Sequence, residues 1–234
     1  MADRPEQISP LLGEVRAFSQ RLHKAAHWKS SGQALSHLEG RQANRVYEFY
    51  CYLCVVADFV QSGYRLSYIP ASDPDKQYFP LGPASYADKP RFAGQVAPDG
   101  EEHLWPYIFV HICLGTGVSN KYGQLRYPDI YVHRACGGAG PTHLDLLWLM
   151  DAKYTKADRQ LPLEVVSAFA DLVRVFDLEK TPAYLRLSLL KAVRSHALIT
   201  NGRQSTMPEA YLQDSNIQEV YRFSPGEHFS VRGT

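Results

Sequence analysis

The most continuous apolar segment of the chain is 44–60, NRVYEFYCYLCVVADFV. Its apolar residues fall on almost every side of a helix, and a helix of that kind lies inside a protein. Asn44 suits the N-cap position, and Gly63 suits the turn that ends a helix. The pattern therefore predicts a buried helix over 44–60.

Shorter apolar or alternating runs, bounded by glycine and proline, predict strands. The run at 144–153 is almost continuously apolar, which indicates a central strand buried on both faces. A glycine cluster at 137–141 precedes it and favours a hairpin with the strand before. Helical patterns cover 162–177 and 183–195. The predicted strands are 64–69, 105–114, 127–135, 144–154, 197–200 and 217–223.

Two segments stand apart from this pattern. Residues 1–40 are polar with weak helical patterning, and we interpret them as an N-terminal helical arm. Residues 70–103 are rich in proline and lack periodicity, which predicts a loop-rich insertion within a main domain of residues 41–234. The order of helix, strands, helices and strand predicts an α/β fold in which helices flank a mixed sheet.

Composition agrees with a folded domain: 45% of residues are hydrophobic and 21% are charged. The net charge of +1 weakens a nucleic-acid interpretation but does not exclude one, because a balanced total can contain a basic cleft. The chain has no long apolar run and no signal-like N-terminus, so we expect a cytoplasmic protein with no membrane partner. Four dispersed cysteines fit reduced thiols better than a disulfide framework.

Candidate chemistry gathers at the end of the predicted central strand. Residues two apart in a strand share a face, so Asp151 and Lys153 point the same way. Asp129 follows Pro128 at the start of the preceding strand. If the two strands form the expected hairpin, Asp129 and Asp151 converge.

Converging carboxylates repel each other unless a cation lies between them or one of them takes up a proton. Mg²⁺, or Mn²⁺ in its place, is the natural occupant, because it prefers oxygen ligands and binds through one or two carboxylates plus phosphate oxygens. Such an ion lowers the pKa of a bound water and neutralises charge on a phosphate. Lys153 would position or activate the attacking water.

Glu48 is a lone carboxylate early in the apolar helix, and a buried carboxylate needs a partner or a metal. Its neighbours at i+3, i+4 and i+7 include no cation, so we expect its partner to come from elsewhere in the fold. The alternative is a structural carboxylate bonded to an arginine or to the backbone.

These residues carry a resemblance to a known superfamily. Pro128-Asp129, then Asp151-Ala152-Lys153, with Glu48 on an upstream helix, is similar to the pattern of the PD-(D/E)xK nucleases, whose core is the restriction-endonuclease-like fold. The segments VYEFYCYL, YPDIYV and LLWLMDAKYTK resemble most the branch with the nuclease subunits of McrBC-type restriction systems and related prokaryotic defence nucleases.

The resemblance spans about residues 44–200 and implies a four-stranded mixed sheet between helices. It implies that Asp129, Asp151 and the Ala152 carbonyl bind the metal, that Glu48 binds it directly or through water, and that Lys153 is the catalytic lysine. It also implies a DNA endonuclease of a prokaryotic restriction or antiviral defence system. Targeting would depend on a partner subunit, such as an ATPase or sensor, or on oligomerisation, with the arm and the insertion as contact surfaces.

Other interpretations stay open at this point. Asp151 and Lys153 would also fit a surface ion pair, and the same metal chemistry would serve an RNA-directed nuclease. A non-catalytic nucleic-acid-binding or assembly subunit could keep the fold. Several basic residues flank the proposed site and would contact phosphates or simply be surface charges: Lys156, Arg159 and Arg203.

Two metal-like patterns point more to packing. Cys51-x-x-Cys54 lies within an apolar helix with no second pair, which favours the core. A set of histidines and cysteines could be assembled into a zinc site, but its spacing matches no standard finger: His111, Cys113, His133, Cys136 and His143.

Overall fold

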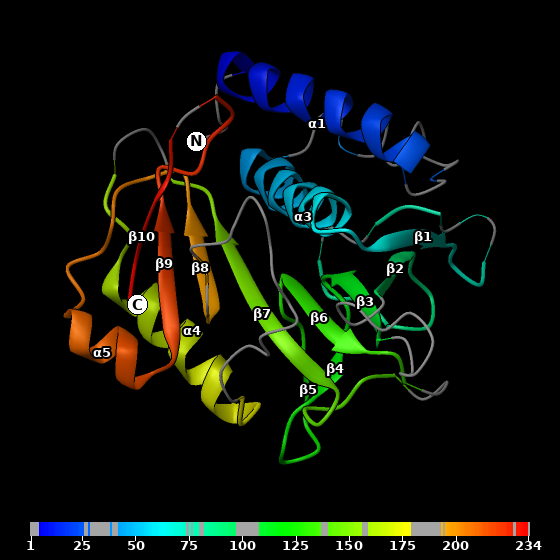
Figure 1. Cartoon of the computed structure of the whole chain (residues 1–234). Helices are drawn as coiled ribbons and strands as arrows, with labels where there is room; N and C mark the ends of the chain where they lie inside the picture. Colours follow the sequence, from blue (N-terminus) through cyan, green and yellow to red (C-terminus); the bar gives the residue numbers. More distant parts are fainter. Residues whose placement is uncertain are drawn as a thin grey trace.

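An eight-stranded sheet forms the centre of the protein, in the order β1-β2-β3-β6-β7-β8-β9-β10 (Figure 1). The structure is a computed structural model and describes residues 5–25, 28, 38, 42–73, 75, 77–79, 82–96, 108–136, 140–155, 159–178, 193, 195–226 and 228–233. The strands are β1 (Arg65–Ile69), β2 (Arg91–Val96), β3 (Ile108–Leu114), β6 (Ile130–Arg134), β7 (Leu146–Lys153), β8 (His196–Thr200), β9 (Ile217–Tyr221) and β10 (Ser230–Arg232). A separate small hairpin pairs β4 (Val118–Ser119) with β5 (Leu125–Arg126).

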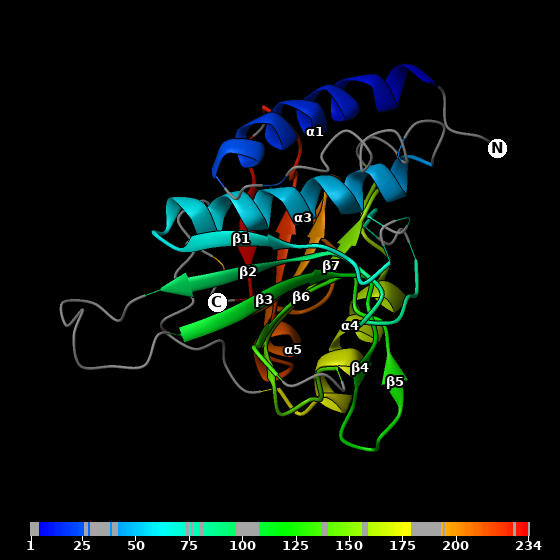
Figure 2. The same ribbon diagram turned by 90° about the vertical axis from the view of Figure 1, so that its right-hand side faces the viewer.

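The sheet is mixed: β7, β8 and β9 run parallel, whereas the other neighbours are antiparallel. Helices cover both faces, with α1 (Pro5–Ala25) and α3 (Ala43–Gln61) on one side and α4 (Leu163–Val175) and α5 (Glu209–Asp214) on the other (Figures 1 and 2). Two hydrophobic clusters fill the space between these layers, one under α3 and one under α4. An α/β fold with a mixed sheet between helices is therefore confirmed.

Helix α3 is the buried helix that the sequence predicts, and fifteen of its nineteen residues are buried. The predicted N-cap was wrong by two positions. Gln42 is the N-cap, and its carbonyl accepts the N–H groups of Arg45 and Val46, while Asn44 lies exposed in the first turn. The predicted end is right, because Gly63 takes the positive φ of 89° that lets the chain leave the helix.

Strand β7 is central, as its apolar run predicts. It is the fifth of the eight strands, and its neighbouring side chains enter different cores: Met150 joins the cluster under α3, and Leu149 joins the cluster under α4. Burial on both faces explains why apolar residues follow one another here without the polar alternation of a half-exposed strand.

The loop predicted over 70–103 is wrong in part, because β2 lies within it and pairs with both β1 and β3. Phe92 is fully buried and contacts the rings of Trp28 and Phe79, which ties the strand to the core. Gly94, which packs beneath Leu66, interrupts the alternation that would have indicated a strand. Residues 97–103 lie outside the described residues. The helix predicted over 183–195 also lies outside them, apart from Val193 and Ser195.

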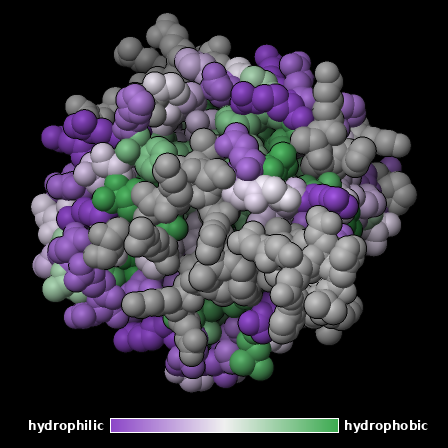
Figure 3. Space-filling view, in the orientation of Figure 1, coloured by the Kyte–Doolittle hydropathy of each residue, from purple (hydrophilic) through white to green (hydrophobic). Residues whose placement is uncertain are grey.

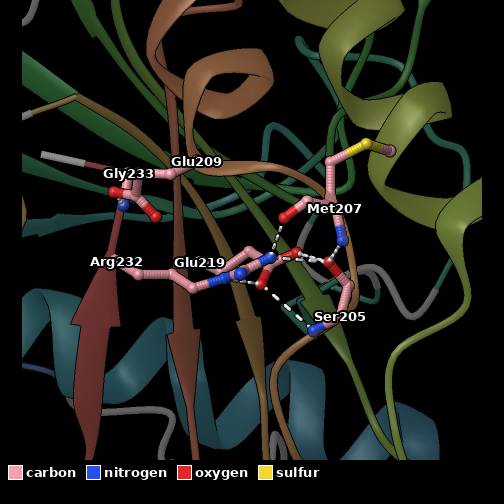
Figure 4. Close-up of polar contacts among 6 residues, drawn as sticks. All are labelled: Ser205, Met207, Glu209, Glu219, Arg232 and Gly233. Carbon is pink, nitrogen blue, oxygen red and sulfur yellow. Dashed lines mark hydrogen bonds and ion pairs between the residues drawn. The ribbon is translucent and has the colours of Figure 1, made fainter.

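A polar clasp holds the last strand, β10, against the sheet (Figure 4). The fully buried carboxylate of Glu219 accepts hydrogen bonds from Ser205 and from the Arg232 guanidinium, whose Nε lies 2.7 Å away. Arg232 also donates to the Met207 carbonyl at 2.9 Å. A buried charge is tolerated because it is paired and fully hydrogen-bonded, so this clasp joins β9, β10 and the segment before α5.

None of the helices in the described part of the chain has the length and apolar character needed to cross a membrane. In the view of Figure 3, hydrophilic and hydrophobic residues are interspersed over the described surface. Three of the exposed large apolar side chains of the protein lie close together in sequence, on and just after the β4–β5 hairpin: Tyr122, Leu125 and Tyr127.

Candidate active site

The structure brings Asp129, Asp151 and Lys153 together at one end of β7. Strands β6 and β7 are antiparallel, and Ile130 opposite Met150 is the last pair of their ladder, so Asp129 and Asp151 come next in register. The Lys153 ammonium lies 3.0 Å from Asp129 Oδ2 and 2.7 Å from Asp151 Oδ1. The predicted convergence of the two aspartates is present, with a lysine cation contacting both.

The backbone of Ala152 takes part in the same cluster. Its N–H donates to Asp129 Oδ2 at 3.1 Å, and in a strand the N–H and C=O of one residue point to the same side. The register places Pro128 opposite Ala152, and proline has no N–H to offer to the ladder. We infer that Pro128 keeps the Ala152 carbonyl out of the ladder and turned toward Asp129, as a metal ligand requires.

Glu48 reaches this cluster from the first turns of α3. It is 5% exposed, and its Oε2 accepts from the Arg45 guanidinium at 3.0 Å. The expectation that its partner comes from elsewhere in the fold is wrong, because Arg45 lies three residues earlier on the same helix. Helical neighbours occur on both sides of a residue, and the cation is at i−3 rather than at i+3, i+4 or i+7.

The two aspartates do not behave alike. Burial and the negative charge of Asp129 raise the pKa of Asp151 well above its ordinary value, and Lys153 opposes this only in part. Burial also acts to raise the pKa of Asp129, but hydrogen bonds from Asp151, Lys153 and the Ala152 N–H outweigh it, so that pKa is lowered. The pair therefore retains one proton to higher pH than separate carboxyls would, and the raised pKa of Asp151 favours that carboxyl as the site of the proton.

The charge of Asp129 also shifts the pKa values of Glu48 and Lys153. Burial, followed by the charge of Asp129, raises the pKa of Glu48 to about 7, although Arg45 and Lys153 favour its ionised form. Burial acts to lower the pKa of Lys153, but the two aspartates outweigh it and raise that pKa above its ordinary value. Lys153 is thus an ammonium at neutral pH, while the carboxylates around it repel one another.

The donor set suits a hard divalent cation. Asp129, Asp151 and the Ala152 carbonyl offer oxygen ligands, and Mg²⁺ needs only one or two carboxylates beside water and phosphate. Within the described residues, no group of three or more histidine, cysteine or acidic side chains is arranged to hold a metal ion. Glu48 therefore does not form a closed set of metal ligands with the two aspartates. The Lys153 ammonium takes the place of a metal ion between the aspartates.

Two loops brace this end of the sheet. Asn201, after β8, accepts from the Thr155 N–H at 2.7 Å and donates to the Thr155 carbonyl at 2.9 Å. The Arg203 N–H donates to the Arg159 carbonyl at 3.0 Å. Because β7 and β8 are parallel, both loops leave the sheet at the edge where Lys153 lies. Arg159 and Arg203 are exposed there, and Lys156 lies outside the described residues.

The histidine and cysteine set does not form a zinc site. Although His111 and His133 pack ring against ring, the described residues include no metal-holding group of three. Burial lowers the pKa of His111 to about 4 and that of His133 to about 3, so both are neutral members of the core. All four cysteines are free, and Cys51 and Cys54 are buried in α3, as core packing predicts.

A cavity of about 440 Å³ lies between α4 and α5. None of the proposed site residues lines it, and Asp129, Asp151 and Lys153 occupy a different part of the fold. We therefore place the candidate chemistry at the strand ends, where charge and burial conflict, rather than in this cavity.

Comparisons with protein-family models, with curated proteins and with solved structures find no match to this chain.

Proposed function

We propose that this protein is a Mg²⁺-dependent nuclease that hydrolyses phosphodiester bonds of DNA at Asp129, Asp151 and Lys153. The observation that carries the proposal is the contact of one lysine ammonium with two half-buried aspartates, at 3.0 and 2.7 Å, on the end of a central strand. A group of charges with such opposed pKa shifts is costly to maintain and is typical of a catalytic site.

Asp129 and Asp151 would hold the ion, with the Ala152 carbonyl beside them and Glu48 reaching it directly or through water. When bound, Mg²⁺ supplies positive charge at the scissile phosphate and makes an attacking water more acidic. Lys153 donates hydrogen bonds to that phosphate or orients the water, and its raised pKa keeps it charged throughout. Arg45 holds Glu48 in place from the same helix.

The resemblance to the PD-(D/E)xK nucleases supports the same assignment. The mixed sheet between helices is compatible with that fold, and Asp129, Asp151 and Lys153 lie in one cluster as the pattern implies. A role in prokaryotic defence, and targeting through a partner subunit or an oligomer, stay predictions from the resemblance.

The test is cleavage of plasmid, single-stranded DNA and RNA by the purified protein, with Mg²⁺, Mn²⁺ or EDTA. We expect cleavage of DNA that needs the metal and is lost in Asp151→Asn and Lys153→Ala. Asp151→Asn should melt no lower than the wild type, because asparagine resembles the protonated form that the folded site favours.

Asp171→Asn is the matched control, since Asp171 forms an exposed ion pair with Arg174 at 2.7 Å far from the cluster. It should retain wild-type cleavage. Metal-dependent cleavage that persists in Asp151→Asn would place the chemistry elsewhere. Cleavage of RNA alone would support the alternative substrate.

A further inference from the structure

A second, smaller cavity lies beside the segment that carries Asp129, and none of the residues of the proposed chemistry lines it. Its volume is about 220 Å³, and none of the side chains around it is charged. It is lined by Ser85, Tyr86, Ala87, Gly117, Ser119, Leu125, Tyr127, Gly140 and Pro141. At roughly 30 Å³ per water it holds the equivalent of about seven waters, which is room for one flat ring system.

Two walls of the cavity are tied to the candidate active site. Tyr127 is two residues before Asp129, so their Cα atoms are at most about 7 Å apart. On the other wall, Gly117 is two residues after Gly115, whose N–H donates to the Asp129 carbonyl at 2.8 Å. Two parts of the cavity wall are therefore joined directly to the backbone of Asp129.

The inner wall is a rigid aromatic surface. The Tyr86 ring has the Arg91 guanidinium 4.5 Å from its centre, and its hydroxyl bonds to His111 Nδ1 at 2.8 Å. A Cβ added at Gly140, whose φ is +88°, would stand 3.7 Å from Tyr86. The outer wall differs, since Tyr127 and Leu125 are 42% and 48% exposed. An aromatic floor with an exposed apolar rim fits a flat ligand that enters from solvent.

We propose that this cavity receives one unstacked base of a DNA strand next to the scissile phosphate, with Tyr127 stacking on the base. The inference rests on the proposed function, which supplies the nucleic acid. A neutral, aromatic cavity beside two acids suits a base rather than a phosphate, because a phosphate would meet repulsion without any cation in the lining. Arg126, exposed beside Tyr127, is placed to contact the backbone.

The inference also gives a role to part of the segment predicted as a loop-rich insertion. Ser85 and Tyr86 belong to it, and the backbone of Ala84 pairs with residues 115–117 at 3.0 and 3.1 Å. These bonds fix the insertion against the end of β3. A contact with the substrate strand replaces the contact with a partner protein that we expected from the sequence for this part of the insertion.

The experiment is a coupling measurement that needs no cleavage. Short single-stranded DNA oligonucleotides, each abasic at one position, are titrated with the protein in Ca²⁺ and in EDTA, and fluorescence anisotropy reports affinity. We expect one position where loss of the base weakens binding about tenfold. The intact strand should bind Tyr127→Ala about tenfold more weakly than it binds the wild type. Removal of the base at the sensitive position should then cause no further loss of affinity. Tyr127→Phe should behave as the wild type.

Tyr122→Ala is the matched control, because Tyr122 is 68% exposed and does not line the cavity. It should lose affinity on removal of the base as the wild type does. The inference would be overturned if removal of a base weakened binding to Tyr127→Ala as much as binding to the wild type. It would also be overturned if no abasic position weakened binding, or if the protein bound none of the strands. If cleavage depends on Asp151 but the effects of Tyr127→Ala and of base removal are independent, only the base site is refuted. If those two effects are coupled but no strand is cleaved, only the nuclease proposal is refuted.

Discussion

At the scale of single residues, the cluster around Lys153 combines the buried carboxylate of Glu48 and two half-buried aspartates with two cations, Lys153 and Arg45. Glu48 is the member with the weakest partners, since its ion pair with Arg45 is half exposed. Its raised pKa means that folding binds a proton there. Stability from this group is fully present below the unfolded pKa of 4.5 and is lost as the pH rises through about 7.

Glu48→Gln removes this pH dependence, because glutamine resembles the protonated side chain. In EDTA, the variant should have the same free energy of unfolding as the wild type near pH 4.5. At pH 8 it should be more stable by on the order of 3 kcal/mol, since the pKa is raised from 4.5 to about 7 and one pKa unit is worth about 1.4 kcal/mol. Urea unfolding at the two pH values is the measurement.

Glu164→Gln provides the comparison for this variant, since Glu164 is an exposed glutamate in the first turn of α4. Its stability should follow the wild type at both pH values. An equal change in Glu48→Gln at pH 4.5 and pH 8 would contradict a raised pKa for Glu48.

Strand periodicity was sufficient to place Asp151 and Lys153 together, because a two-residue repeat on a strand fixes which side chains share a face. The placement of Asp129 depended on the predicted hairpin, which β6 and β7 form. Periodicity was not sufficient for the pairing of Glu48, because the partner, Arg45, lies three residues before Glu48 on the helix. The cavity beside Asp129 could not be predicted either. Its walls come from four segments, around 85, 117, 127 and 140, and only the folded chain brings them together.

At the scale of elements, the loops after β7 and β8 depend on a glycine. A Cβ at Gly202 would overlap both Thr155 Oγ1 and the Arg159 carbonyl, and the second of these is backbone that cannot rotate away. We expect Gly202→Ala to destabilise the protein by about 2 kcal/mol. It should also reduce DNA cleavage, because the same loop braces the end of β7.

Gly13→Ala is the matched control, since an added Cβ in α1 meets no described atom within 4 Å. Alanine favours helix, so this variant should be as stable as the wild type or more stable by up to about 1 kcal/mol. Thermal and urea unfolding measure both variants. Equal stability of Gly202→Ala and the wild type would show that the two loops do not pack as described.

The clasp on β10 makes a second prediction at this scale. Arg232→Met leaves the Glu219 carboxylate buried without a cation, which should cost about 3 kcal/mol in the free energy of unfolding. Adding Glu219→Gln to that variant should recover much of the loss, because the amide carries no charge. Arg174→Met, which breaks an exposed pair, should change stability by less than about 0.5 kcal/mol.

Elements that the sequence did not predict are short or interrupted. β10 has three residues and α5 has six, which is too few for a clear period. In β2, Gly94 stands where an apolar residue would have completed the alternation. The long elements α3, β7 and α4 were predicted because each repeats its pattern over several turns or residue pairs.

At the scale of the whole molecule, binding of a metal ion should stabilise the folded protein, because the unfolded chain does not bring Asp129 and Asp151 together. Mg²⁺ at ten times its dissociation constant should raise the melting temperature by about 4 °C. The shift should be absent in Asp129→Asn and present in Asp171→Asn. An equal shift in Asp129→Asn would mean that Mg²⁺ binds elsewhere.

One bond described by the structure has a consequence for the synthesis of this protein. The Tyr47 hydroxyl donates to the carbonyl of Phe223 at 2.9 Å, across 176 positions of sequence, and Tyr47 is next to Glu48 on α3. The helix that carries Glu48 therefore gains this anchor only after the ribosome has made Phe223. We expect a nascent or truncated chain to hold an incomplete candidate site, so that the proposed activity would arise only in chains that extend past Phe223.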